Sequence, residues 1–218
     1  MSKYKAVLFD YDGTLMDTNE LIIESWQHMA RQLIGHELSQ DEMLSTFGLP
    51  LVDAMEEVRV KYGLRCSADE MCDMYRSYQY KHVFEQRHPF EGTEEMLSGI
   101  QKKGIKIGIV TSRFIASTEE GLKQFDLLKY FDAIIGVDDT DIHKPNPEPA
   151  ILCCNKLNVA PNECLMVGDS VFDLQCGHNA GTDACFVTWS MCTSTEKAAA
   201  EASPEYKINT PQELINLV

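Results

Sequence analysis

Short runs of apolar residues alternate with longer amphipathic stretches along most of the chain. The apolar runs have the length of buried parallel strands and are bounded by polar or turn-forming residues. Strands are predicted at Ala6–Phe9, Ile105–Val110, Ala133–Ile135, Cys164–Val167 and Ala184–Val187. Helices are predicted between them at Thr93–Lys103, Ile115–Phe125, Glu148–Leu157 and Phe172–Asn179. This alternation is typical of an α/β fold with a doubly wound parallel sheet.

One long segment breaks the alternation, because from Asp17 to about Gln86 it shows helix signals and no convincing strand. Asp17 or Thr18 can cap a first helix whose apolar side chains share one face, and Gly35 can end that helix. Further helices are predicted near Gln40–Thr46, Leu51–Tyr62 and Ser67–Glu85. We therefore expect a helical domain at residues 16–86, inserted into an α/β core formed by residues 1–15 and 87–218.

The charge of the chain narrows the classes of partner. Lys and Arg number 19 against 34 Asp and Glu, which gives a net charge of −15. Such a protein repels nucleic acid and anionic membrane surfaces unless a basic cluster intervenes, and the sequence shows none. It also shows no signal-peptide pattern, and its eight cysteines form no C-x-x-C pair. We expect a cytoplasmic enzyme with reduced thiols and without nucleic-acid or membrane partners.

Two aspartates directly follow the first predicted strand. Asp10 and Asp12 stand in the string DYDGTL, residues 10–15, at the strand's carboxyl end, where open α/β sheets bind ligands. Gly13 allows a sharp turn there, and Thr14 can hold it. Covalent phosphoryl transfer needs this pairing, because one carboxylate attacks phosphorus while its neighbour handles the proton of the leaving group.

Other polar residues follow the later strands. Thr111 and Ser112 end the second predicted strand and can hold phosphoryl oxygens, and Lys144 can neutralise charge. Asp169 and Asp173 follow the strand that ends at residue 167. Taken singly, these residues could be helix caps or solvated charges. Their occurrence together at strand ends favours one phosphoryl-transfer site, and its oxygen ligands favour Mg²⁺.

With these residues in place, the sequence resembles the haloacid dehalogenase superfamily, whose four motifs match along the whole chain. The resemblance implies a Rossmann-like core with a C1-type helical cap at the position of the insertion. It implies Asp10, Asp12, Thr111 and Lys144 as catalytic residues, Thr111, Ser112, Arg113 and Lys144 as substrate-binding residues, and Asp10, Asp12, Asp169 and Asp173 as the metal site. In that site Asp12 would use its backbone carbonyl, and Asp173 would lie in the second shell or be an outer ligand.

The same resemblance implies a mechanism. Asp10 would attack phosphorus to form an aspartyl phosphate while Asp12 protonates the departing oxygen, and Asp12 would then activate the hydrolytic water. The resemblance extends most closely to phosphoglycolate phosphatases and PpaX-type pyrophosphatases.

Several rival functions can be weighed from the sequence. The acid Asp12 disfavours a dehalogenase, and the loop at residues 47–51 has no lysine for phosphonatase chemistry. Ile22 and Leu51 replace the His and Arg expected of β-phosphoglucomutase relatives, although a mutase or sugar-phosphate phosphatase remains an alternative. A phospho-accepting signalling or binding protein is an alternative of another class, but a receiver needs no long helical insertion.

The predicted cap also bears on the size of the substrate. A cap that closes over the cleft limits its volume, and the loop Gly48-Leu49-Pro50-Leu51 offers apolar side chains with no charged fork. We therefore expect a small substrate such as pyrophosphate or a short phosphorylated acid. Glu20 on the first predicted cap helix could face the cleft, but a solvated helix charge is the more ordinary interpretation.

Overall fold

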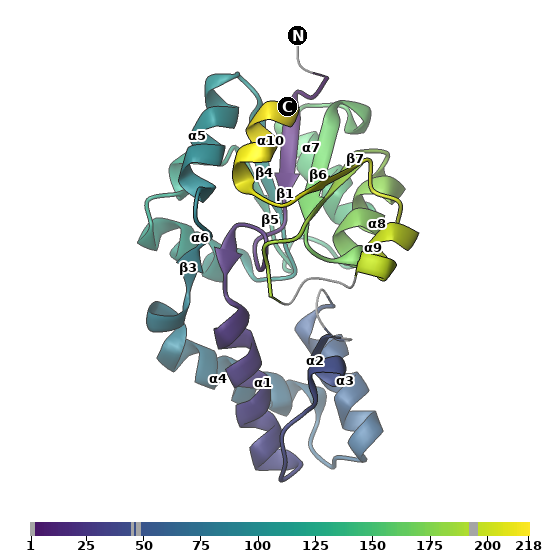
Figure 1. Cartoon of the computed structure of the whole chain (residues 1–218). Coiled ribbons are helices and arrows are strands. Elements are labelled where there is room, and N and C mark those ends of the chain that lie inside the picture. The colour runs from purple at the N-terminus through teal and green to yellow at the C-terminus, as the bar shows by residue number, and fades with distance from the viewer. Residues whose placement is uncertain (1–2, 45, 47–48, 192–195) are drawn as a thin grey trace.

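The computed structural model describes residues 3–44, 46, 49–191 and 196–218. Its centre is a six-stranded sheet in the order β5-β4-β1-β6-β7-β8, in which every neighbouring pair is parallel (Figure 1). The strands are β1 (Ala6–Phe9), β4 (Lys106–Val110), β5 (Ala133–Ile135), β6 (Cys164–Gly168), β7 (Asp183–Val187) and β8 (Tyr206–Ile208). The five strands predicted from the sequence all lie in this sheet.

Helices cover both faces of the sheet, which explains why β1 is a continuous buried apolar run. They are α5 (Thr93–Lys102), α6 (Ile115–Gln124), α7 (Glu148–Leu157), α8 (Val171–Ala180), α9 (Glu196–Glu201) and α10 (Pro211–Leu217). Side chains of α5, α6 and α10 fill one core with Val7 and Phe9, whereas α7 and α8 fill another with Ala6 and Leu8. These two interiors confirm the predicted α/β fold.

The segment between β1 and β4 is mostly helical and carries its own interior. It contains α1 (Asn19–Leu33), α2 (Gln40–Leu44), α3 (Leu51–Tyr62) and α4 (Ala68–Gln86), close to the predicted ranges. Trp26 and Met29 of α1 pack with Met55 of α3 and with Met71 and Tyr75 of α4. In Figure 1 these helices lie together below the carboxyl ends of the central strands.

A short ribbon joins the helical segment to the sheet. Strands β2 (Met16–Asp17) and β3 (His88–Pro89) pair in antiparallel fashion and stand beside the predicted boundaries of the insertion. The expectation of a strand-free segment from Asp17 was therefore wrong at its first residue. Two residues per strand are too few to show the periodicity by which strands are predicted.

Two further observations concern the whole described chain. Within it, no helix combines the length and the apolar character needed to cross a membrane. The seven described cysteines are free thiols, and six of them are buried. Cys192 lies outside the described residues.

Candidate active site

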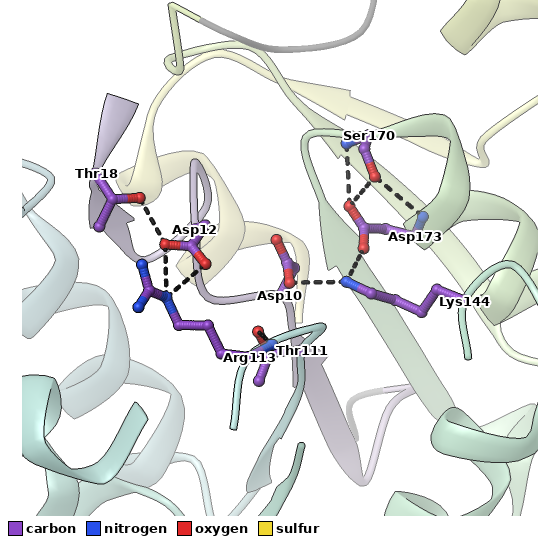
Figure 2. A network of polar contacts seen from close by, with 8 residues as sticks. All are labelled: Asp10, Asp12, Thr18, Thr111, Arg113, Lys144, Ser170 and Asp173. Carbon is purple, nitrogen blue, oxygen red and sulfur yellow. Dashed lines mark hydrogen bonds and ion pairs between the residues drawn. The ribbon is translucent and has the colours of Figure 1, made fainter. Parts of the chain in front are cut away.

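The predicted site residues converge at one edge of the sheet. Asp10 follows β1, Thr111 follows β4 and Asp169 follows β6, and β1 lies between the other two strands. Their carboxyl ends therefore meet, as expected for ligand sites in open parallel sheets. Lys144 reaches the same place from the loop between β5 and α7, and Asp173 does so from the first turn of α8 (Figure 2).

Lys144 links two of the carboxylates. Its Nζ lies 2.8 Å from Asp10 Oδ1 and 2.6 Å from Asp173 Oδ1, and all three side chains are buried. Burial alone would lower the pKa of Lys144, but the two carboxylates outweigh it and raise that pKa. Burial raises the pKa of Asp10 to about 7, although Lys144 opposes the shift. The lysine therefore holds the predicted nucleophile in a fixed position.

Asp173 combines a structural role with a place in the site. Its second oxygen accepts hydrogen bonds from the Ser170 backbone N–H at 3.0 Å and the Ser170 hydroxyl at 2.6 Å, which forms a capping box at the start of α8. Gly168 lacks the side chain that would occupy this space, since a Cβ there would stand 2.4 Å from Asp173 Cβ. The structure confirms the capping interpretation of Asp173, and the other oxygen of this side chain contacts Lys144 in the candidate site.

Three carboxylates offer a place for a cation. Asp10, Asp169 and Asp173 each have a ligand oxygen within 4.8 Å of the others, and all three are buried. Burial, together with Asp173 and Asp10, raises the pKa of Asp169 well above its usual value. Crowded buried carboxylates of this kind fit a hard divalent cation, because its charge would offset their repulsion.

Asp12, the second aspartate of the DYDGTL string, faces away from this cluster (Figure 2). Arg113 Nε lies 3.0 Å from Asp12 Oδ1 and 2.8 Å from Oδ2, and the Thr18 hydroxyl donates to Oδ1 at 2.6 Å. Thr18 does stand at the N-cap of α1, but its side chain makes no capping hydrogen bond. Of the two expected caps, Asp17 accepts a hydrogen bond from the Asn19 backbone N–H at 3.2 Å, whereas the Thr18 hydroxyl donates to Asp12 instead.

The predicted phosphate-binding residues surround the same opening. Thr111 Oγ1 accepts a hydrogen bond from the Arg113 backbone N–H at 3.2 Å, and Thr111, Ser112 and Arg113 all line the cavity. The Arg113 guanidinium is already paired with Asp12 in this arrangement. To bind a phosphate as well, the guanidinium would have to divide its N–H groups between Asp12 and the phosphate.

A cavity of about 990 Å³ separates the strand ends from the helical segment. On the helical side it is lined by Ile22 and Trp26 of α1, the stretch 49–52, and Tyr75, Arg76 and Gln79 of α4. The apolar character expected of the loop holds for residues 49–51, whereas Gly48 lies outside the described residues. Glu20 is exposed and is not among the described residues of the lining.

Sequence reasoning missed several polar residues of the site. The Ser190 hydroxyl bonds the Asp169 carboxylate and lies 3.1 Å from Asn19 Oδ1, so it connects a metal-site carboxylate with the first residue of α1. Nothing in the local sequence distinguishes Ser190. Arg76 and Gln79 of α4 line the cavity with Tyr75, and the sequence analysis singled out neither of them.

Comparisons with known proteins agree with this geometry. Residues 7–187 match the family of haloacid dehalogenase-like hydrolases. The chain is 37% identical to a Clostridium perfringens protein provisionally assigned as the pyrophosphatase PpaX, over 98% of this chain and 97% of that protein. It is 34% identical to the pyrophosphatase PpaX of Bacillus velezensis, over 97% and 95% of the two chains.

Among solved structures, the fold matches a Lactobacillus plantarum protein provisionally assigned as a phosphoglycolate phosphatase. The TM-score is 0.84 at 25% identity, and both chains are covered completely (100%). The family matches most of the chain, and the relatives match nearly all of it. The chain belongs to the haloacid dehalogenase-like hydrolase family, and within it is a phosphohydrolase.

Proposed function

We propose that this protein is a Mg²⁺-dependent phosphatase that hydrolyses a small phosphate ester or anhydride through an aspartyl-phosphate intermediate. One observation carries the proposal. The Asp10 carboxylate lies 2.8 Å from the buried Lys144 Nζ, at the carboxyl ends of the strands. It is also close to two more buried carboxylates. A carboxylate fixed beside a cation and a metal site suits nucleophilic attack on phosphorus.

The proposed steps conserve atoms and charge. An Asp10 oxygen attacks phosphorus, the bond from phosphorus to the leaving oxygen breaks, and that oxygen takes a proton from Asp12. For this step Asp12 must enter protonated, released from its ion pair with Arg113. In the second step Asp12, now ionised, takes a proton from a water whose oxygen attacks the phosphorus of the intermediate. Inorganic phosphate departs and the Asp10 carboxylate is restored. Thr111 and Lys144 offset the charge on the transferring oxygens.

The residues that would hold Mg²⁺ are the side chains of Asp10 and Asp169 and the backbone carbonyl of Asp12, with Asp173 in an outer position. The ion, when bound, supplies positive charge beside the phosphoryl oxygens. Asp173 suits the outer position, because Ser170 and Lys144 already bond its two oxygens. The buried carboxylates fit this assignment because they would otherwise repel one another.

The substrate we propose is pyrophosphate or phosphoglycolate. Pyrophosphatase relatives at 34–37% identity favour the first, and the Lactobacillus plantarum structure favours the second. Ile22 and Leu51 present apolar side chains to the cavity, which argues against a mutase that must grip a sugar. A sugar-phosphate phosphatase remains the second candidate, because about 990 Å³ would also accommodate a hexose phosphate.

We further propose that residues 16–86 act as a cap that closes on the core through the β2–β3 ribbon. The ribbon contains both crossings of the chain between the two parts, so a small change there would move the helices together. Closure would reduce the cavity and exclude water from the first step. We also propose a cytoplasmic location, and the acidic composition disfavours nucleic-acid or membrane partners.

The test of this function is Asp10→Asn. We expect steady-state phosphate release with Mg²⁺ to fall at least about a thousandfold, because an amide is a poor nucleophile. The melting temperature without metal should be retained or raised, since a charge leaves a crowded carboxylate cluster. Asp53→Asn on the exposed surface of α3 is the matched control and should keep full activity. Unchanged turnover by a folded Asp10→Asn protein would overturn the proposed function.

A further inference from the structure

The cavity contains a cation that the proposed chemistry does not use. The lysine and arginine side chains that line it, within the described chain, are Arg76, Arg113 and Lys144. Arg113 is paired with Asp12, and Lys144 is paired with Asp10 and Asp173. Arg76, on α4, has one recorded ion pair, to Asp73 at 3.9 Å one turn earlier, where Asp73 is 82% exposed. Such a solvated pair contributes little, so Arg76 can exchange it for a ligand.

The position of Arg76 is set by a contact across the cavity. Its guanidinium carbon lies 5.2 Å from the centre of the Phe114 ring. Phe114 directly follows Arg113 and is the N-cap residue of α6 in the core. A guanidinium over an aromatic face keeps its N–H groups at the ring edge available for a second partner. The contact therefore brings a cation of the helical segment next to the loop whose Arg113 is paired with Asp12.

Tyr75, the neighbour of Arg76, lines the same cavity as Asp12. Burial raises the pKa of Tyr75, while Arg113 lowers it and Asp12 raises it through space. Gln79, one turn further along α4, donates to the Tyr75 hydroxyl at 3.0 Å and also lines the cavity. Tyr75, Arg76 and Gln79 thus form a polar strip opposite the proposed acid, and Arg76 is its charged member.

The position of this polar strip on α4 determines which part of a bound substrate it would contact. In the proposed mechanism the transferred phosphoryl group lies at Asp10 and the leaving oxygen at Asp12. The rest of the leaving group must then extend from Asp12 into the cavity toward α4. The lining also contains the acidic side chains Asp41 and Glu120, which would repel an anion if no cation stood there.

We propose that Arg76 is a specificity-determining residue that binds negative charge on the leaving group, either a second phosphate or a carboxylate. This inference rests on the proposed phosphatase function and extends it to a class of substrate. Pyrophosphate and phosphoglycolate share an anionic leaving group, so one subsite would serve both. Arginine suits this role because its planar fork binds both phosphate and carboxylate oxygens in pairs.

The kinetic test compares substrates that differ in leaving-group charge. Phosphoglycolate and pyrophosphate have anionic leaving groups, and isobutyl phosphate has a neutral group of similar shape to glycolate. For Arg76→Gln we expect kcat/KM with Mg²⁺ to fall about tenfold or more for the anionic pair and less than about threefold for isobutyl phosphate. Arg76→Lys should recover part of the loss. Arg65→Gln, an exposed position of the helical segment that is outside the described lining, is the matched control and should change neither.

A binding test separates this inference from the chemistry. Methylenediphosphonate has two anionic ends and cannot be hydrolysed, whereas methylphosphonate has one. Arg76→Gln should weaken binding of methylenediphosphonate about tenfold and leave that of methylphosphonate unchanged, measured by calorimetry with Mg²⁺. Equal effects on both ligands, or on charged and neutral substrates, would overturn the role of Arg76. Wild-type protein that binds both ligands but hydrolyses no phosphate would instead overturn the proposed function.

Discussion

The two walls of the cavity differ in how firmly their side chains are held. On the sheet side, Asp10, Lys144 and Asp173 are nearly inaccessible and are joined by contacts of 2.6–2.8 Å. The helical side combines buried side chains such as Trp26 and Tyr75 with exposed ones, of which Val52 is 42% exposed and Tyr80 is 79% exposed. Reacting groups need a fixed geometry, whereas a surface that selects substrates can change without loss of chemistry. We infer from this difference that the reaction belongs to the sheet side and substrate choice to the helical side.

The packing beneath each wall supports this division. Glycines under the catalytic loops leave no space for a methyl group, and at Gly13 a Cβ would stand 2.2 Å from Asp169 Oδ2. The helical interior contains Met29, Met43 and Met55, whose flexible side chains fill space without fixing it. Substitutions on the sheet side should therefore be costly and specific, and those on the helical side mild.

The largest expected effects separate two aspartates of the sheet side. We expect Asp12→Asn to lower kcat about a hundredfold or more, because it removes the proton donor and acceptor, and excess Mg²⁺ should not restore it. Asp169→Ala should show a similar loss at low Mg²⁺ and recover as the concentration rises, because it weakens metal binding. Phosphate release measured across a Mg²⁺ series checks both.

The control for this pair is Asp41→Asn, an aspartate of α2 that lines the helical side of the cavity. It should change KM more than kcat if the helical side selects the substrate and the sheet side carries out the reaction. The opposite pattern, in which Mg²⁺ rescued Asp12→Asn and left Asp169→Ala unchanged, would show that the roles of the two aspartates are reversed.

A smaller effect tests the packing contrast. At Gly121 in α6 a Cβ would stand 1.9 Å from the Tyr11 hydroxyl, and Tyr11 lies between the two motif aspartates. We expect Gly121→Ala to lower the free energy of unfolding by about 2 kcal/mol and to lower kcat as Tyr11 shifts. In the helical segment, a Cβ added at Gly63 would meet no other described residue within 4 Å, and the residue has a positive φ of 61°. Gly63→Ala should cost about 1 kcal/mol and leave kcat unchanged.

Urea unfolding monitored by circular dichroism gives the two free energies, and phosphate release gives kcat. If Gly63→Ala impaired turnover as much as Gly121→Ala did, the helical side would be part of the reacting geometry. The contrast between the walls would then be wrong.

What could be predicted from the sequence follows the same division. The strand at Ala6–Phe9 was predicted to the residue, because four buried apolar residues before an aspartate permit few other structures. Thr111 and Asp169 were found because each follows a strand next to β1, so topology brings them to Asp10, whereas Lys144 and Asp173 lie in the adjacent loop and helix. The predicted nucleophile, lysine and acids of the cluster converge as expected, and their roles remain predictions.

The features that were missed depend on contacts between distant residues. Strand β8 has three residues, and its central Lys207 is exposed, so no apolar run marks it. Thr18 bonds Asp12 where a helix cap was expected, and this choice depends on the fold of the whole loop. Arg76 is a surface residue of an amphipathic helix by pattern, and only the approach of α4 to Phe114 places it in the cavity.

The smallest expected effect concerns carboxylates that respond to pH in opposite ways on the two sides. On the sheet side, burial raises the pKa of Asp10 to about 7 from 3.8. On the helical side, hydrogen bonds from Lys61, Tyr62 and Ser39 lower the pKa of Glu42 below its usual value of 4.5. A raised carboxyl pKa means that the folded protein binds more protons than the unfolded chain between the two pKa values, so stability falls as pH rises through that window. Glu42 has the opposite sign, and its contribution is lost only as pH falls below about 4.5.

A scan from about pH 5 to pH 7.5 therefore isolates the sheet side, because Glu42 is ionised in both states there. Without metal we expect the melting temperature to fall by about 3 °C as the pH rises over this range, because the folded protein must ionise the buried Asp10 carboxyl. Asp10→Asn should reduce this dependence of the melting temperature on pH. Glu42→Gln should lower the melting temperature at every pH of the scan without changing its dependence on pH. Mg²⁺ should raise the melting temperature more at the upper end of the range, where its ligands are ionised. Scanning fluorimetry at several pH values with and without Mg²⁺ measures all of these slopes, and an identical slope in the wild type and Asp10→Asn would show that the buried carboxylate does not control stability.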